Sequence, residues 1–222
     1  YGIELGVLYR GERELCFLPL AHAYSCAFNF LVPMAVGAHV YLLGKVPSPK
    51  ILLKAFEEVK PNLILTVPLI LEKIYKKMIL PQLSKTTMKV ALNIPLLDSR
   101  IYAQIRKKLV DAFGGRFREV IVGGAAMNEE VTNFLYKIKF PFTIGYGMTE
   151  CGPLISYDHN DEYVPGSCGQ ILKGIMKVRI DSEDPYNKVG EIQVSGENVM
   201  KGYYKNEEAT SKVFTEDGWL RT

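Results

Sequence analysis

Residues 15–44 contain no Asp, Glu, Lys or Arg, and an uncharged run of this length either crosses a membrane or lies in a protein core. A spanning helix needs about 20 consecutive apolar residues. The run is interrupted by residues that favour turns or polar contacts: Pro19, His22, Asn29, Pro33, Gly37 and His39. Buried parallel strands are continuous apolar runs because helices cover both faces of their sheet. We therefore predict a strand, a helix and a second strand within a soluble α/β core.

The chain up to about residue 150 continues this alternation of strands and helices. Ser48 is a suitable N-cap, Pro49 suits the first helical position, and Pro61 ends the helix that they begin. Helices are further predicted from Pro68 to about residue 80, from about residue 98 to 113, and after Asn128; strands are predicted at 63–67, 120–122 and 142–144. Repeated strand–helix–strand units of this length predict a parallel sheet flanked by helices, with right-handed crossovers.

The pattern changes beyond about residue 153. Apolar and polar residues alternate at 176–180 and again at 192–195, which is the period of half-buried antiparallel strands. We therefore predict two parts: an α/β subdomain over residues 1–154 and a smaller β-rich subdomain over residues 155–222.

Charge and cysteine content narrow the classes of function. The chain has 27 Lys and Arg against 24 Asp and Glu, a net charge of +3, so electrostatics give no strong case for nucleic-acid binding. The four cysteines have no zinc-like spacing, and we predict reduced thiols in the cytoplasm. The basic residues Lys76, Lys77 and 106–108 have two interpretations. They contact an anionic membrane surface or coenzyme A phosphates, or they form a solvated helix face, which the weak net charge favours.

Two glycine-rich turns follow predicted strands, at the sheet edge where ligands gather in α/β proteins. The turn 123–127 offers bare backbone to a planar ligand or a phosphate, although a tight packing turn explains its glycines equally well. The turn 145–150 combines an aromatic ring, a hydroxyl and a carboxylate. Tyr146 suits stacking on a base, Thr149 suits a phosphate oxygen, and Glu150 suits Mg²⁺. The alternative is a loop with a buried tyrosine and a solvated glutamate.

The segment GYGMTECGP at residues 145–153 resembles the YGxTE signature of the adenylate-forming superfamily, which includes acyl-CoA synthetases, luciferases and peptide-synthetase adenylation domains. Further segments are similar to this family's motifs in the same order: LPLAHAYS at 18–25, VGGAAM at 122–127, GEIQVSGENVMKGYYKNEEAT at 190–210 and DGWLRT at 217–222. Residues 93–127, which run into the turn Gly123-Gly124-Ala125, are similar to the long-chain fatty acyl branch of this family. The loop 166–174 follows the family pattern loosely, and Ile144 replaces a polar residue of many relatives.

The resemblance implies roles for individual residues. The adenine would be lined by Gly123, Gly124 and Ala125, with Tyr146 against its ring, and Gly145 and Gly147 would complete the nucleotide-binding loop. Thr149 would contact the adenylate phosphate and Glu150 would hold Mg²⁺. His22 would lie beside the acyl carboxylate, where an imidazole donates a hydrogen bond or acts as a gate. Without the family, His22 is better explained as a core histidine, given its apolar neighbours.

The implied reaction converts a fatty acid, ATP and coenzyme A into acyl-CoA, AMP and pyrophosphate through an acyl-adenylate. Mg²⁺ and positioned donors would neutralise the phosphates, and no protein nucleophile is required. Two alternatives stay open: an adenylate-forming enzyme for aryl or amino acids, and a non-catalytic nucleotide-binding module. Acyl length, oligomeric state and peripheral membrane contact are left undetermined.

Several family features lie outside these 222 residues: the phosphate loop ending in Pro-Lys-Gly, the aspartate that would follow Thr222, and the C-terminal domain with its adenylation lysine. The chain also begins at Tyr1 rather than at a methionine. We interpret it as an internal piece of a longer ligase, with the β-rich part truncated at its C-terminal end. We predict that this piece alone forms neither acyl-adenylate nor acyl-CoA, and fatty-acid-dependent pyrophosphate release by it would contradict this.

Overall fold

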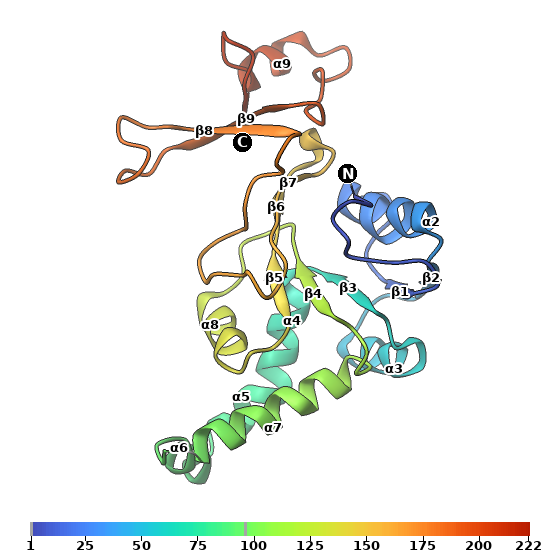
Figure 1. Ribbon diagram of the computed structural model, residues 1–222, viewed down its shortest axis with the longest axis vertical. Coiled ribbons are helices and arrows are strands. Elements are labelled where there is room, and N and C mark those ends of the chain that lie inside the picture. The colour runs from blue at the N-terminus through green and yellow to red at the C-terminus, as the bar shows by residue number, and fades with distance from the viewer. Residues whose placement is uncertain (1, 96) are drawn as a thin grey trace.

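The computed structural model describes residues 2–95 and 97–222, and its largest element is a five-stranded parallel sheet of order β2-β1-β3-β4-β5 (Figure 1). The strands are β1 (Arg13–Cys16), β2 (His39–Leu42), β3 (Leu63–Thr66), β4 (Glu119–Val122) and β5 (Phe142–Ile144). All four residues of both β3 and β4 are buried. The predicted parallel sheet flanked by helices is confirmed.

Helices connect these strands and cover the sheet. They are α1 (Ala23–Ser25), η1 (Cys26–Leu31), α2 (Val32–Val36), α3 (Pro49–Val59), α4 (Pro68–Ile74), η2 (Tyr75–Ile79), α5 (Leu80–Leu83), α6 (Thr86–Leu92), α7 (Leu97–Ala112) and α8 (Glu129–Lys137). In α3 the predicted cap is present, because Ser48 Oγ accepts a hydrogen bond from the backbone N–H of Ile51 at 3.4 Å. The uncharged run contains the second half of β1, the consecutive helical segments α1, η1 and α2, and β2. Within the part of the chain that the structure describes, no helix is long and apolar enough to cross a membrane.

The core between α3 and α7 is aromatic. The rings of Phe56 and Phe113 are stacked with centroids 5.1 Å apart, and both side chains are fully buried. Gly114 follows Phe113 with a φ of +93°, and a Cβ there would lie 2.5 Å from the carbonyl oxygen of Phe56. The end of α7 therefore requires glycine, which lets the chain turn closely past α3 into β4.

Two antiparallel sheets follow the parallel one. The strands β6 (Tyr146–Gly147) and β7 (Leu154–Ser156) pair around η3 (Thr149–Cys151), while β8 (Met176–Asp181), β9 (Glu191–Gly196) and β10 (Leu220–Arg221) form a sheet of order β10-β9-β8. The helix α9 (Glu207–Val213) lies with this second sheet, apart from the parallel sheet (Figure 1). The alternation at 176–180 and 192–195 correctly predicted β8 and β9. The division after residue 154 falls within β7 and stays a prediction.

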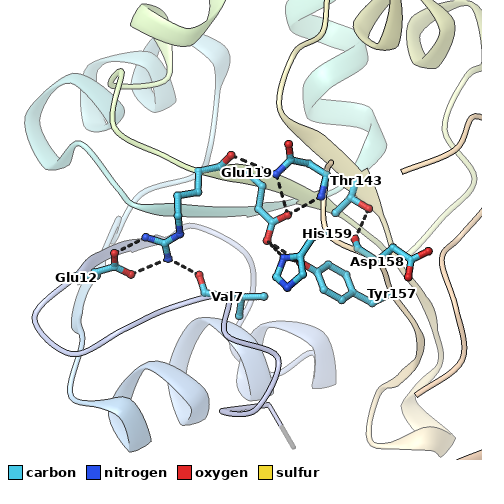
Figure 2. A network of polar contacts seen from close by, with 9 residues as sticks. Val7, Glu12, Glu119, Thr143, Tyr157, Asp158 and His159 are labelled. Carbon is cyan, nitrogen blue, oxygen red and sulfur yellow. Dashed lines mark hydrogen bonds and ion pairs between the residues drawn. The ribbon is translucent and has the colours of Figure 1, made fainter. Parts of the chain in front are cut away.

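A polar network holds the amino-terminal end of β4 (Figure 2). The carboxylate of Glu119 accepts hydrogen bonds from the Tyr157 hydroxyl at 2.6 Å and from the backbone N–H of Asn160 at 3.1 Å, and His159 Nδ1 lies 3.3 Å from it. The neighbouring Arg118 pairs with Glu12 and donates to the carbonyl of Val7. This network joins the N-terminal segment and the segment after β7 to one end of the sheet. The glycine-rich turns lie at the other end.

Candidate functional site

The two glycine-rich turns are adjacent at the carboxyl-terminal edge of the sheet. β4 passes into Gly123 and β5 passes into Gly145. The N–H of Gly145 donates to the carbonyl of Val122 at 3.0 Å, and the N–H of Gly123 donates to the carbonyl of Thr66 at 3.1 Å. These hydrogen bonds continue the strand pairing past the last strand residues. The sheet therefore fixes both turns side by side.

Glycine is needed in each turn for a different reason. Gly124 has a φ of +87°, a conformation that side chains disfavour. A Cβ at Gly147 would lie 2.0 Å from the carbonyl oxygen of Pro153, so only a glycine allows β6 to pair closely with β7. The first turn thus needs backbone freedom and the second needs space.

Two adjoining cavities open at these turns. The larger, of about 600 Å³, lies between the 124–127 turn, the end of β5 and the segment 163–168. The smaller, of about 270 Å³, extends from the same turns to η3 and α1. Four residues line both cavities: Gly124, Gly145, Tyr146 and Gly147. Of the other predicted site residues, Ala125 lines the larger cavity, and the smaller cavity is lined by His22, Gly123, Thr149 and Glu150. The structure therefore brings all the predicted site residues to one continuous region.

His22 is exposed and stands at the start of α1. Its Nδ1 accepts a hydrogen bond from the backbone N–H of Tyr24 at 3.2 Å, so a neutral ring carries its proton on Nε2. The interpretation of His22 as a core histidine is wrong, because the short helix holds the ring at the mouth of a cavity rather than in the apolar interior.

Tyr24 was missed by the sequence reasoning, although it lies only two residues after His22. Its hydroxyl donates to the carbonyl of Ile121 at 3.2 Å, and its ring lines the smaller cavity. Burial, with a smaller effect from Glu14, raises the pKa of Tyr24 far above its ordinary value. The side chain is therefore a neutral wall of the cavity that links α1 to β4.

The turn 149–151 places a hydroxyl and a carboxylate next to each other. Thr149 is exposed and Glu150 is half-buried. The Oε1 of Glu150 accepts a hydrogen bond from the Tyr203 hydroxyl at 2.8 Å, and its backbone carbonyl accepts one from the N–H of Met200 at 2.7 Å. Tyr146, whose ring lines both cavities, donates its hydroxyl to Thr222 Oγ1 at 2.8 Å. Groups distant in sequence thus converge on this turn.

The donor set around Glu150 suits a metal ion that arrives with phosphates. Within residues 2–95 and 97–222, no cluster of three or more His, Cys, Asp or Glu side chains could hold a metal by itself. Mg²⁺ is commonly bound by one or two carboxylates together with substrate phosphates and water. Glu150, with the Thr149 hydroxyl beside it, fits that kind of site.

Comparison with known proteins identifies the family. The family model described as AMP-binding enzyme matches residues 3–204. The chain belongs to the AMP-binding enzyme family. Curated relatives of this family member include long-chain-fatty-acid–CoA ligase 1 of Saccharomyces cerevisiae, which is 28% identical over 95% of the chain and 33% of the relative. Another is 4-coumarate–CoA ligase 1 of Narcissus pseudonarcissus, which is 30% identical over 94% of the chain and 35% of the relative. The chain therefore spans about a third of the length of these relatives.

Solved structures share the fold of this chain. Apo MatB from Rhodopseudomonas palustris matches with a TM-score of 0.71 and 20% identity, covering 99% of the chain and 38% of that protein. O-succinylbenzoate coenzyme A synthetase from Bacillus subtilis, in complex with ATP and magnesium ion, matches with a TM-score of 0.69 and 23% identity, covering all of the chain and 40% of that protein. At these identities the likeness supports the fold alone.

Proposed function

We propose that the full-length protein containing this chain is an ATP-dependent long-chain fatty acid–CoA ligase that works through an acyl-adenylate. The observation that carries the proposal is the gathering of all the predicted adenylate residues around two adjoining cavities. The yeast long-chain-fatty-acid–CoA ligase among the relatives supports the substrate class. ATP, Mg²⁺, coenzyme A and a fatty acid are the small molecules that this proposal requires.

The adenine would lie in the larger cavity against Gly124 and Ala125, with the Tyr146 ring at the boundary between the cavities. The acyl carboxylate would lie in the smaller cavity, where His22 carries a proton on Nε2 that can be donated to a carboxylate oxygen. This assignment puts the adenine in the larger cavity and brings the two reacting groups, the acyl carboxylate and the α-phosphate beside Thr149, together in the smaller cavity. Their proximity is the main catalytic contribution that this part of the chain can make.

The chemistry then requires charge neutralisation rather than a protein nucleophile. A carboxylate that attacks the α-phosphate approaches a group of like charge, and Thr149 is placed to donate a hydrogen bond to a phosphate oxygen. Mg²⁺ held by Glu150 and the phosphates would supply the remaining neutralisation. The thiol of coenzyme A would then displace AMP from the acyl group. Groups outside this chain are needed for both steps, so we propose that the chain alone is inactive.

Apolar side chains beside the smaller cavity support an apolar acyl group. A further cavity of about 20 Å³ is lined by Tyr24, Ile121 and Leu154, which also line the smaller cavity, and by Leu5, Val7, Phe28, Leu65 and Tyr157. This space has about the size of one water molecule, so a long acyl chain would require its lining side chains, including the Tyr24 ring, to move. The Tyr24 ring therefore favours a second candidate substrate, a compact aromatic acid that stays within the smaller cavity. The 4-coumarate–CoA ligase relative supports this candidate.

Substrate-dependent exchange of pyrophosphate into ATP by the full-length protein tests these candidates. We expect palmitate to support exchange more strongly than 4-coumarate, benzoate or amino acids. Preference for an aromatic acid would replace the long-chain proposal with the second candidate. Absence of exchange with every acid would favour a non-catalytic nucleotide-binding module, and this control requires that ATP binding be measured in the same preparation.

We further propose a cytoplasmic protein whose basic residues at 106–108 face water. All three are exposed on α7, and the net charge of +3 gives little attraction to an anionic surface. Co-sedimentation of the full-length protein with anionic vesicles would instead support peripheral membrane contact through this helix.

A further inference from the structure

The segment 198–203, which we call the strap, crosses the turn that carries Glu150. After β9 ends, the side-chain amide of Asn198 donates to the carbonyl of Cys151 at 2.6 Å and to that of Leu154 at 2.9 Å. The N–H of Met200 donates to the carbonyl of Glu150 at 2.7 Å. The strap therefore holds the backbone of the turn at Glu150 and on its C-terminal side.

The strap also brings one side chain to the Glu150 carboxylate. The Tyr203 hydroxyl donates to Oε1 at 2.8 Å, and Oε2 has no hydrogen-bond partner among the described residues. A carboxylate fixed through one oxygen has its other oxygen available for a cation.

The backbone of Tyr203 is itself held by α9. Its N–H donates to Thr210 Oγ1 at 2.9 Å, and that hydroxyl donates to the carbonyl of Asn206 at 2.8 Å. Asn206 caps α9 by accepting from the N–H of Ala209. The preceding Gly202 has a φ of +143°, and a Cβ there would lie 2.8 Å from the Thr210 methyl group. Only a glycine lets the strap approach α9 closely enough for these contacts.

We infer that Tyr203 is a positioning residue that orients the Glu150 carboxylate toward Mg²⁺ carried by the nucleotide. This inference rests on the proposed function, in which Glu150 binds the metal together with phosphate oxygens. Groups that hydrogen-bond a metal-binding carboxylate fix its orientation, and their loss typically lowers metal affinity about 10- to 100-fold. The backbone contacts of the strap hold the turn without the phenol, so the hydroxyl of Tyr203 has the carboxylate as its specific target.

The neighbouring Tyr204 provides a matched control. Its side chain is 88% exposed, against 36% for Tyr203, and no hydrogen bond to its hydroxyl occurs among residues 2–95 and 97–222. The substitutions Y203F and Y204F each remove one hydroxyl, from the last residue of the strap and from the residue that follows it. A difference between them reports the contact with Glu150 rather than a general effect of losing a phenol.

The test measures binding of a fluorescent ATP analogue to the full-length protein as Mg²⁺ is titrated, in Y203F, Y204F and E150Q. We expect Y203F to raise the Mg²⁺ concentration for half-maximal binding about 10-fold while metal-free binding and the midpoint of thermal unfolding stay unchanged. Y204F should match the parent protein. E150Q should raise the Mg²⁺ requirement at least as far as Y203F does.

The outcomes separate this inference from the function on which it rests. If E150Q changes the Mg²⁺ requirement but Y203F does not, the role of Tyr203 is overturned and the proposed function survives. If E150Q has no effect, the metal assignment of the proposed function fails, and the role of Tyr203 fails with it. If Y203F weakens binding equally with and without Mg²⁺, or lowers the unfolding midpoint, its role is structural and the inference is wrong.

Discussion

The two edges of the parallel sheet treat polar groups in opposite ways. At the amino-terminal edge, the carboxylate of Glu119 is 3% exposed and receives hydrogen bonds from Tyr157 and Asn160, with His159 also in contact. At the carboxyl-terminal edge, Glu150 accepts one side-chain hydrogen bond, from Tyr203, and the adjacent turns are glycine-rich and bordered by cavities. Saturated groups hold strands together, whereas incompletely paired groups remain free to bind a ligand.

A second buried glutamate at the amino-terminal edge is an exception to this saturation, because Glu14 is in register with Leu63 of β3, which is in register with Glu119 of β4. Glu14 in β1 is fully buried, yet only the side chain of Asn29 donates to it, at 2.6 Å, and its Oε2 has no partner in the described part of the chain. Burial raises the pKa of Glu14 to about 8, and the hydrogen bond from Asn29 only partly opposes this. Glu14 therefore carries a proton at neutral pH in a large fraction of molecules.

The largest effect is expected at the carboxyl-terminal edge of the sheet, where Glu150 lies. Glu150→Gln in the full-length protein should lower the rate of adenylation about 100- to 1000-fold, because a neutral amide loses most of the attraction for a metal at the phosphates. Folding should be nearly unchanged, since the half-buried side chain contributes little packing. Pyrophosphate exchange measures the rate, and an undiminished rate at saturating Mg²⁺ would remove Glu150 from the site.

At the amino-terminal edge of the sheet, where Glu119 lies, we expect a large effect on stability rather than on catalysis. Glu119→Ala should lower the free energy of unfolding by about 3 kcal/mol, because it leaves the Tyr157 hydroxyl and the Asn160 N–H without their buried acceptor. Urea unfolding of the 222-residue chain followed by circular dichroism measures this. Tyr157→Phe is the matched control, since it removes a single hydroxyl from the same network. A loss below about 1 kcal/mol for Glu119→Ala would show that the network does not hold this edge.

The contrast between the two edges also shows which features could be predicted from the sequence and which could not. Local signals predicted β3, β4 and α3, because strand hydrophobicity and the Ser48 cap act within a few residues. The two glycine-rich turns were recognised because they directly follow strands. The contacts that complete both edges were missed: Tyr203 is 53 positions from Glu150, and Tyr157 is 38 positions from Glu119. Such pairs depend on how distant segments fold together, so no local sequence pattern predicts them.

Comparing the free energy of unfolding of Glu14→Gln with that of the parent chain at several pH values tests whether the buried Glu14 carboxyl is protonated. A folded-state pKa of about 8, above the ordinary value of about 4.5, means that the folded chain keeps a proton that the unfolded chain has lost. Stability from this group is complete below about pH 4.5 and is lost as pH rises through about 8. We expect Glu14→Gln to be nearly neutral at pH 5 and to stabilise the chain by up to about 4 kcal/mol at pH 9. Equal effects at both pH values would show that Glu14 is ionised in the folded chain or unimportant.

The smallest effect is expected from the most exposed member of the Glu119 network. The His159 side chain is 44% exposed, and its Nδ1 lies 3.3 Å from a carboxylate that keeps its hydrogen bonds from Tyr157 and Asn160. A partly exposed contact of this kind contributes little, so His159→Ala should lower the free energy of unfolding by about 0.5 kcal/mol or less. Tyr157→Phe should cost more, about 1.5 kcal/mol, because its buried hydroxyl donates to a charged group at 2.6 Å. A larger loss for His159→Ala than for Tyr157→Phe in urea unfolding would mean that the amino-terminal edge depends on the histidine. The Glu119 carboxylate would then be less fully paired than the distances indicate.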